Sequence, residues 1–143
     1  MQESLPRPIS AEEVAVIYRA LEVCPTGPVS QALRDSVPTL CVIWRCTCGC
    51  DTVNFEHMNE SARQTIVADG IGETPAGKEI GLIVFGKGDH VVSLEVYGFD
   101  NEPARLPTLD SIRPFGHRRP FAFAMRMVPY IRCLSSAGHI ASA

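Results

Sequence analysis

The hydrophobic positions near the start of the chain repeat with the period of an amphipathic helix. Ser10 precedes these positions and Glu13 follows Ser10 by three residues, which is the spacing of a capping box at a helix N-terminus. Pro25 is expected to end this helix, and residues 30–36 predict a second, shorter one. The apolar face of the first helix consists of Val14, Ile17, Tyr18 and Leu21.

From residue 39 onward the pattern changes to the two-residue alternation of β-strands, interrupted by turn residues. Residues 80–85 are apolar at successive positions, so this strand is expected to be buried on both faces in the middle of a sheet. Together with residues 91–97 it predicts the clearest hairpin, and residues 109–115 are expected to close the domain. The expected strands are 39–47, 52–55, 65–69, 80–85 and 91–97.

Helices that precede a series of hairpin-linked strands indicate an α+β fold. We expect the N-terminal helix and the short second helix to pack on a largely antiparallel sheet of about five strands, built of hairpins. With 143 residues and 45% hydrophobic content, the chain is long enough for one domain with a core. Residues 1–115 are assigned to this domain and residues 116–143 to a C-terminal tail or arm.

Charge is distributed unevenly along the chain. Residues 1–110 carry all 16 acids and 8 of the 13 basic residues, whereas residues 111–143 carry five arginines and no acid. The basic tail is expected to pack against its own acidic domain or against a second copy of the chain. Nucleic acid is not the favoured partner, because arginines mixed with proline, phenylalanine and methionine match no known binding module.

Aromatic residues and methionines alternate in the tail, at Phe121, Phe123, Met125 and Met127. This alternation predicts an extended segment about one strand long. We expect an arm that forms a homodimer through residues 116–143. An edge strand of the same chain and a disordered end are the alternatives.

The sequence contains no secretory signal and no apolar run long enough to span a membrane. We therefore expect no membrane association and a cytoplasmic location, where the six cysteines remain thiols. An exported protein whose signal had been removed would carry the same sequence, and for such a protein the inference about the thiols would be reversed.

Several short motifs occur in an order that resembles a group of small uncharacterised bacterial proteins. They are Cys46-x-Cys48-Gly49-Cys50, the stretch 81–85 (GLIVF), the stretch 94–97 (LEVY), Leu106-Pro107 and Pro114-Phe115. The resemblance covers about residues 38–115 and does not extend to residues 116–143. It implies no activity, because none is established for that group.

The cluster Cys46, Cys48 and Cys50 is the segment of the chain most suited to metal or redox chemistry. On a straight strand the first and last of these residues would be about 13 Å apart, whereas zinc holds two thiolates at most about 4.6 Å apart. A shared metal therefore requires Gly49 to bend the chain. His57, across the predicted hairpin, would then complete a set of three thiolates and one histidine.

Two other interpretations of the cysteines stay open. Cys46 shares its alternation with the apolar residues before it, so it is also expected as an ordinary core cysteine. Cys48 and Cys50, at the turn, are candidates for exposed reactive thiols, with Arg45 as the nearest cation. The remaining cysteines, Cys24, Cys41 and Cys133, are interpreted as core or incidental residues.

Ser93, Glu95 and Tyr97 alternate on one face of the last predicted strand. A carboxylate between two hydroxyl groups would suit a ligand pocket, while the alternative is a solvent-facing strand surface. The sequence offers no catalytic signature such as G-x-S-x-G or H-E-x-x-H and no phosphate-binding loop. We therefore assign no catalytic and no cofactor-binding residues, and we favour a protein that is not an enzyme.

Three functions are ranked on this basis. The first is a small non-catalytic cytoplasmic protein that acts as a protein-binding or regulatory module, with an unidentified protein partner and without a cofactor. The second is a zinc-binding or other metal-binding module that uses the cysteine turn. The third is a thiol-dependent redox protein or enzyme.

Overall fold

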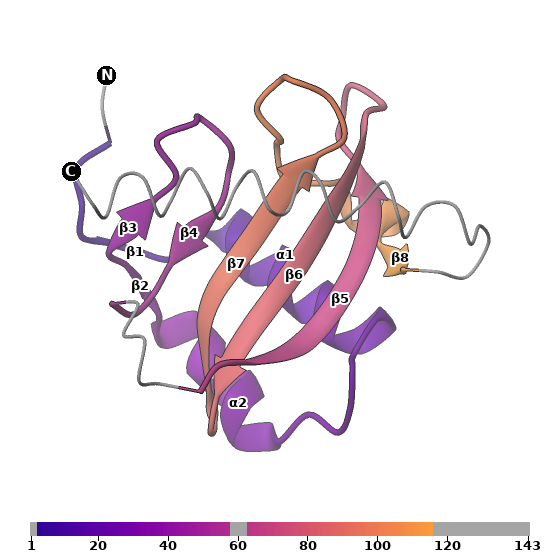
Figure 1. Cartoon of the computed structure of the whole chain (residues 1–143). Helices are drawn as coiled ribbons and strands as arrows, with labels where there is room; N and C mark the ends of the chain where they lie inside the picture. Colours follow the sequence, from indigo (N-terminus) through magenta and orange to yellow (C-terminus); the bar gives the residue numbers. More distant parts are fainter. Residues whose placement is uncertain (1–2, 58–62, 116–143) are drawn as a thin grey trace.

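The computed structural model describes residues 3–57 and 63–115, and its centre is an antiparallel sheet of six strands (Figure 1). Two helices, α1 (Ala11–Val23) and α2 (Gln31–Ser36), precede most of the strands along the chain. The fold is therefore α+β, as the sequence predicts. The strands are β1 (Arg7–Pro8), β2 (Cys41–Val42), β3 (Trp44–Arg45), β4 (Val53–Asn54), β5 (Thr65–Glu73), β6 (Glu79–Lys87), β7 (His90–Gly98) and β8 (Arg113–Pro114).

The large sheet has the order β3-β4-β7-β6-β5-β8, and all of its pairs are antiparallel. The expectation of about five strands is wrong for this sheet. The additional strand is β8, which pairs with the outer edge of β5 through Gly70–Pro114 and Ile71–Arg113. It is only two residues long, and its proline cannot donate a ladder hydrogen bond, which explains why the strand pattern does not reveal it.

The single strand expected over residues 39–47 is also wrong, because this segment divides between two sheets. A 3-10 turn at Val37–Thr39 precedes β2, which pairs with β1 in a separate two-stranded sheet. After Ile43 the chain changes partner, and β3 pairs with β4. Continuous β-type residues therefore do not mean one continuous ladder, because the partner strand is not visible in the local sequence.

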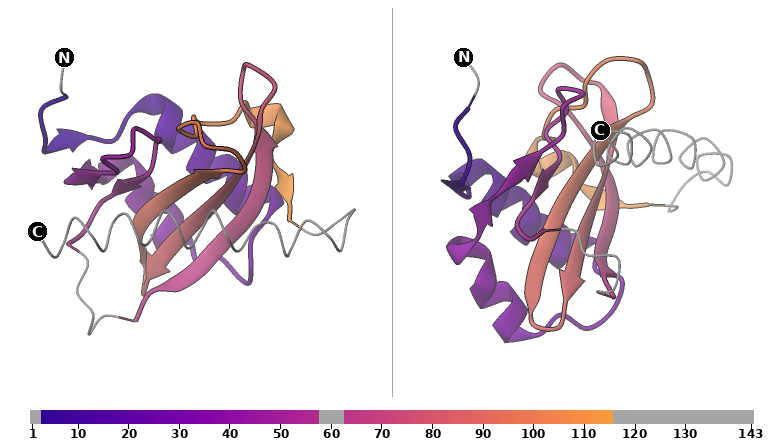
Figure 2. Two further views of the ribbon diagram at one scale, coloured as in Figure 1. Left: turned by 45° about the horizontal axis from the view of Figure 1, so that its top comes forward. Right: turned by 60° about the vertical axis from the view of Figure 1, so that its left-hand side comes forward.

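Helix α1 covers one face of the sheet, behind the strands in Figure 1 and beside them in Figure 2. Its N-terminus has the expected capping box: Ser10 Oγ accepts a hydrogen bond from Glu13 N, and Glu13 accepts one from Ser10 N. Val16, Ile17, Ala20 and Leu21 of α1 are buried in the hydrophobic core. Strands β6 and β7 supply the opposite side of the same core through Leu82, Val84, Leu94 and Val96.

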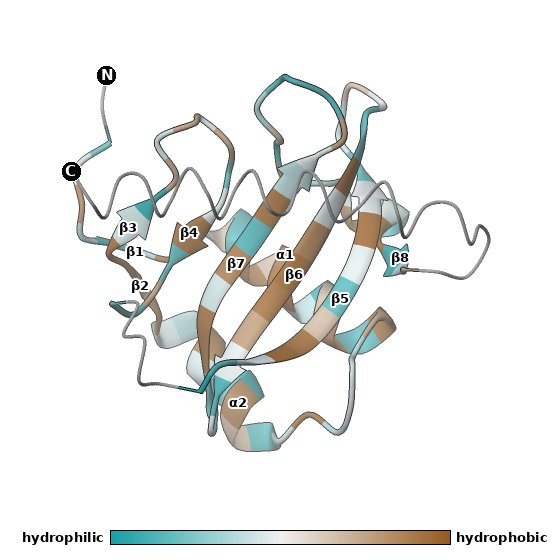
Figure 3. Cartoon of the chain, in the orientation of Figure 1, coloured by the Kyte–Doolittle hydropathy of each residue, from teal (hydrophilic) through white to brown (hydrophobic). Residues whose placement is uncertain are grey.

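Strand β6 lies in the interior of the sheet, between β7 and β5, as its apolar sequence predicts. Figure 3 shows it as a nearly continuous hydrophobic strand. Ile83, which faces away from α1, is almost as buried as Leu82, which faces toward it. The side of the sheet opposite α1 is therefore also covered around Ile83, and this covered face includes the polar residues of β7 discussed below.

Neither of the two described helices combines the length and the apolar character needed to cross a membrane. The dimer arm and the basic tail expected over residues 116–143 lie outside the described residues.

Candidate metal centre

The three clustered cysteines lie in the turn that joins β3 to β4. Gly49 stands at the centre of this turn with a φ of +93°, a conformation that residues with a side chain rarely adopt. The turn closes through a hydrogen bond of 3.0 Å from Cys46 N to Thr52 O. The sequence analysis required Gly49 to bend the chain if the cysteines were to meet, and the observed backbone provides that bend.

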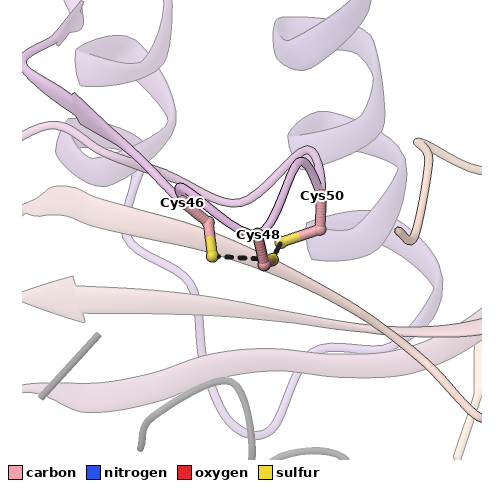
Figure 4. A group of neighbouring side chains, drawn as sticks. All are labelled: Cys46, Cys48 and Cys50. Carbon is pink, nitrogen blue, oxygen red and sulfur yellow. Dashed lines mark hydrogen bonds between the residues drawn. The ribbon is translucent and has the colours of Figure 1, made fainter. Parts of the chain in front are cut away.

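The bend brings the three sulfur atoms together, pointing toward one another from a single turn (Figure 4). Cys46 Sγ lies 2.8 Å from Cys48 Sγ, and Cys48 Sγ lies 3.1 Å from Cys50 Sγ. All three sulfur atoms are within 4.8 Å of one another. Zinc–sulfur bonds of about 2.3 Å place two thiolates about 3.8 Å apart in a tetrahedral site. A shift of about 1 Å in each sulfur pair would therefore suffice to admit a metal ion.

The burial of the three cysteines differs from the simplest expectation. Cys46 is 2% exposed and belongs to the core, as its alternation predicts. Cys50 is only 3% exposed, although its position at the turn suggested that it would reach solvent. Only Cys48 is exposed. The cluster thus has one accessible thiol and two thiols that are already desolvated.

The remaining cysteines of the described part of the chain lie elsewhere. Cys24 is buried in the core, and Cys41 is exposed on the short strand β2. Neither belongs to the sulfur cluster. Cys133 lies outside the described residues.

His57 is not part of the group of ligand atoms formed by the three cysteines. It is an exposed residue beyond the far end of β4, and the strand directs the chain away from the turn. Phe55 N still donates to Val92 O, so the extended course along β7 continues almost to His57. In this structure the three thiols are therefore not accompanied by the histidine that the sequence analysis placed beside them.

Polar contacts fix the turn to the segment that follows β7. Asp51 N donates to Ala104 O over 2.9 Å, and the Asp51 carboxylate accepts a hydrogen bond of 2.8 Å from Leu106 N. The same carboxylate forms an ion pair with Arg105. Arg45, the cation nearest to the cysteines in sequence, pairs with Glu3 at 3.0 Å and approaches Asp51 at 3.8 Å. Its charge is therefore already balanced by carboxylates.

Ser93, Glu95 and Tyr97 lie on the face of β7 that points away from α1, as their alternation predicts. All three are buried, so this part of the strand is not a solvent-facing surface. Tyr97 lies opposite Gly81 on β6, and Glu95 lies opposite Ile83. The hydroxyl group of Ser93 and the Oε2 atom of Glu95 have no hydrogen-bond partner.

Glu95 is the most perturbed acid near the cysteines. Burial raises the pKa of its carboxyl group to about 7, and the negative charge of Cys50 contributes to the shift in the same direction. The carboxyl group is therefore within electrostatic range of Cys50. From the sequence, the cysteine turn and Glu95 are two separate candidate sites, because the pairing of β4 with β7 is not visible in either motif.

Thr52 joins the turn to β7. Its Oγ1 accepts a hydrogen bond of 2.9 Å from Val96 N and donates one of 3.0 Å to Val96 O. Asp51 lies outside strand β4 and does not pair with β7. The Thr52 hydroxyl group therefore makes the two hydrogen bonds to Val96 that a backbone N–H and C=O of a paired strand would otherwise make. The sequence analysis did not single out Thr52, and no motif distinguishes it from an ordinary strand threonine.

Comparison with protein-family models, with curated proteins and with solved structures gave no match. The chemistry of the cysteine turn is therefore inferred from its geometry.

Proposed function

We propose that this protein binds a thiophilic metal ion, with zinc as the expected ion, through Cys46, Cys48 and Cys50. The observation that carries the proposal is the convergence of three sulfur atoms from one turn to within 4.8 Å of one another. Thiolate sulfur is the ligand that zinc and other soft ions prefer. In this proposal the ion is structural, and the protein acts as a non-catalytic binding or regulatory module.

Core packing alone does not account for this arrangement. A buried cysteine behaves as a small hydrophobic residue and gains most from contact with carbon-rich neighbours. Here the sulfur atoms contact one another instead, and the turn holds Gly49 in a conformation that few other residues tolerate. A cation bound between the thiolates would offset both their mutual repulsion and the cost of their burial.

The proposal is tested by measuring the metal content of protein purified without a polyhistidine tag. We expect about one zinc per chain, since the turn provides one set of three thiolates. Cys48→Ser should lower the zinc content strongly, and Cys41→Ser, at an exposed cysteine outside the cluster, should leave it unchanged. Background metal content in the native protein, after incubation with zinc under reducing conditions, would refute the proposal.

A redox function is the second candidate, and the distance of 2.8 Å between the sulfur atoms of Cys46 and Cys48 favours it. A disulfide requires these atoms to move to about 2.05 Å. Two thiols would lose two protons and two electrons to a disulfide oxidant such as oxidised glutathione. Peptide mapping after treatment with a glutathione redox buffer tests this candidate. If Cys46 and Cys48 stay reduced while the oxidant is in excess, the redox function is excluded.

A further inference from the structure

The cysteine turn and Glu95 lie in one row across the sheet. The pairing of Arg45 with Val53 continues to Cys46 opposite Thr52, where Cys46 N donates to Thr52 O. Val53 pairs with Leu94, and one residue before Val53 the Thr52 hydroxyl group bonds the backbone of Val96, so Thr52 lies beside Glu95 on the neighbouring strand. Cys46 and Glu95 therefore lie on either side of Thr52, two strands apart in one row.

Glu95 is not among the ligand atoms that already lie within 4.8 Å of one another, but a side chain in this row is long enough to reach a shared metal ion. Neighbouring strands lie about 4.8 Å apart, so the Cα atoms of Cys46 and Glu95, two strands apart, are separated by roughly 10 Å. A glutamate side chain extends about 5 Å from its Cα atom and a cysteine side chain about 3 Å, from ordinary bond lengths. Two metal bonds of about 2.0 and 2.3 Å add enough length to join them.

Glu95 has the burial and the unpartnered oxygen atom expected of a metal ligand. It is only 7% exposed, and its Oε2 atom has no hydrogen-bond partner. A buried carboxylate without a partner destabilises a fold unless something compensates its charge. A divalent cation between this carboxylate and the thiolates would compensate the negative charge of both.

The other carboxylate next to the cluster is committed elsewhere. Asp51 adjoins Cys50 in sequence, but its oxygen atoms accept the hydrogen bond from Leu106 N and pair with Arg105. These contacts fix the turn to the segment after β7, and they engage the carboxylate oxygens of Asp51, so these oxygens are not available to bind a metal ion. Glu95 is therefore the better placed acid, although it lies 45 residues from Cys50 along the chain.

We propose that Glu95 is the fourth ligand of the metal ion held by Cys46, Cys48 and Cys50. This inference rests on the proposed metal-binding function and specifies its coordination. Four protein ligands make a closed site, and closed sites are typical of structural rather than catalytic zinc. The ion would join the β3–β4 turn to the central strand β7, and its removal would release the edge of the sheet.

The test compares the full-length native protein with Glu95→Gln and with Ser93→Ala. Ser93 is the matched control, because it is a buried residue on the same face of β7 whose hydroxyl group also has no partner. Zinc affinity is measured by competition with a chelator, and cobalt(II) absorption reports the coordination of the site. We expect Glu95→Gln to weaken zinc binding at least about tenfold and to change the cobalt spectrum, and Ser93→Ala to do neither.

Thermal unfolding separates ligation from a purely structural role. Without metal, Glu95→Gln should unfold at a higher temperature than the native protein, because an unpaired buried carboxylate is removed. With zinc in excess, the unfolding temperature of the same variant should rise less than that of the native protein, because stabilisation by a bound ligand depends on its affinity. If Glu95 had only a structural role, the substitution would change the unfolding temperature in the same direction with zinc and without it.

Two outcomes overturn the inference, and they can be distinguished. If the native protein binds neither zinc nor cobalt, the proposed function fails and the role of Glu95 fails with it. If the native protein binds metal and Glu95→Gln matches Ser93→Ala in affinity and cobalt spectrum, metal binding stands and Glu95 is not a ligand.

Discussion

Arg7 and Glu13 form a two-pronged ion pair that joins the N-terminal segment to the start of helix α1. Arg7 Nη1 and Nη2 donate to the two carboxylate oxygens of Glu13 over 2.9 and 2.7 Å. The same carboxylate accepts the hydrogen bond from Ser10 N that completes the capping box. The Glu13 side chain therefore both caps helix α1 and holds strand β1 beside it. The capping-box spacing in the sequence predicts the cap but not the ion pair with Arg7.

Arg7→Gln should destabilise the protein by about 3 kcal/mol at neutral pH, because Glu13 would remain buried without its cation. Burial alone would raise the pKa of Glu13, but the hydrogen bonds from Arg7 and Ser10 outweigh it and lower the pKa. The native pair therefore contributes stability above the pKa of the unfolded carboxyl group, and this stability is lost as pH falls through the lower folded pKa. Urea unfolding between pH 3 and 8, spanning the usual range of carboxyl groups, measures the difference.

The gap in stability between native protein and Arg7→Gln should be widest near neutral pH and should narrow in acid, where Glu13 becomes protonated. Arg19→Gln is the control, since Arg19 forms an exposed pair with Glu22. A gap for Arg7→Gln that stays constant across this range would show that the loss is due to packing and not to charge.

Thr52→Val should cost about 2 kcal/mol, because it removes the hydroxyl group that satisfies both Val96 N and Val96 O in a buried position. Valine keeps the shape of threonine, so the change isolates the two hydrogen bonds. Thr52→Ser keeps the hydroxyl group and should lose much less. Equal losses in the two variants, measured by chemical denaturation, would assign the effect to the methyl group instead.

Gly49→Ala should weaken zinc binding and destabilise the protein by about 1–2 kcal/mol, the usual cost of placing an alanine at positive φ. Steric contact is not the cause, since an added Cβ would meet only Pro103 at ordinary van der Waals distance. Gly77→Ala is the matched control: Gly77 has a φ of +82°, an added Cβ has open space, and the residue lies in the β5–β6 turn, which carries none of the cysteines.

The two glycine variants should therefore lose similar stability, but only Gly49→Ala should lose zinc affinity, as measured by chelator competition. If both variants bind zinc as tightly as the native protein, the bend at Gly49 is not needed to bring the thiols together.

The elements that the sequence predicts well are those with local signals. Ser10 and Glu13 define the start of α1, and the continuous apolar run of β6 with the strand-type residues of β7 defines the central hairpin. The requirement that Gly49 bend the turn also followed from bond lengths and strand geometry. These features depend on residues close together in the chain, so their physics can be followed from the sequence.

The features that the sequence does not predict depend on which strands become neighbours. The chain changes partner at Ile43, so the expected strand over residues 39–47 divides between two sheets. The cysteine turn and Glu95 lie on neighbouring strands because β4 pairs with β7 and not with another strand. Each motif is visible by itself, but only the pairing of β4 with β7 shows that the two motifs lie on neighbouring strands.

Gly81→Ala should destabilise the protein by about 2–3 kcal/mol, because the ring of Tyr97 occupies the space above Gly81. A Cβ atom at residue 81 would overlap Cζ of that ring, so the ring would have to move. Moving it would also disturb the edge-to-face contact with Phe99, whose ring centroid lies 5.9 Å from that of Tyr97. Gly27→Ala, where an added Cβ meets nothing within 4 Å, should be nearly neutral.

A double-mutant cycle shows whether the ring of Tyr97 is the cause. In a Tyr97→Ala background the space above residue 81 is empty, so Gly81→Ala should lose most of its penalty and the two changes should not be additive. The free energies of unfolding come from urea titrations of the four proteins. If the losses in the free energy of unfolding are additive, the cost of Gly81→Ala arises in the backbone of β6 and not from a clash with the ring of Tyr97.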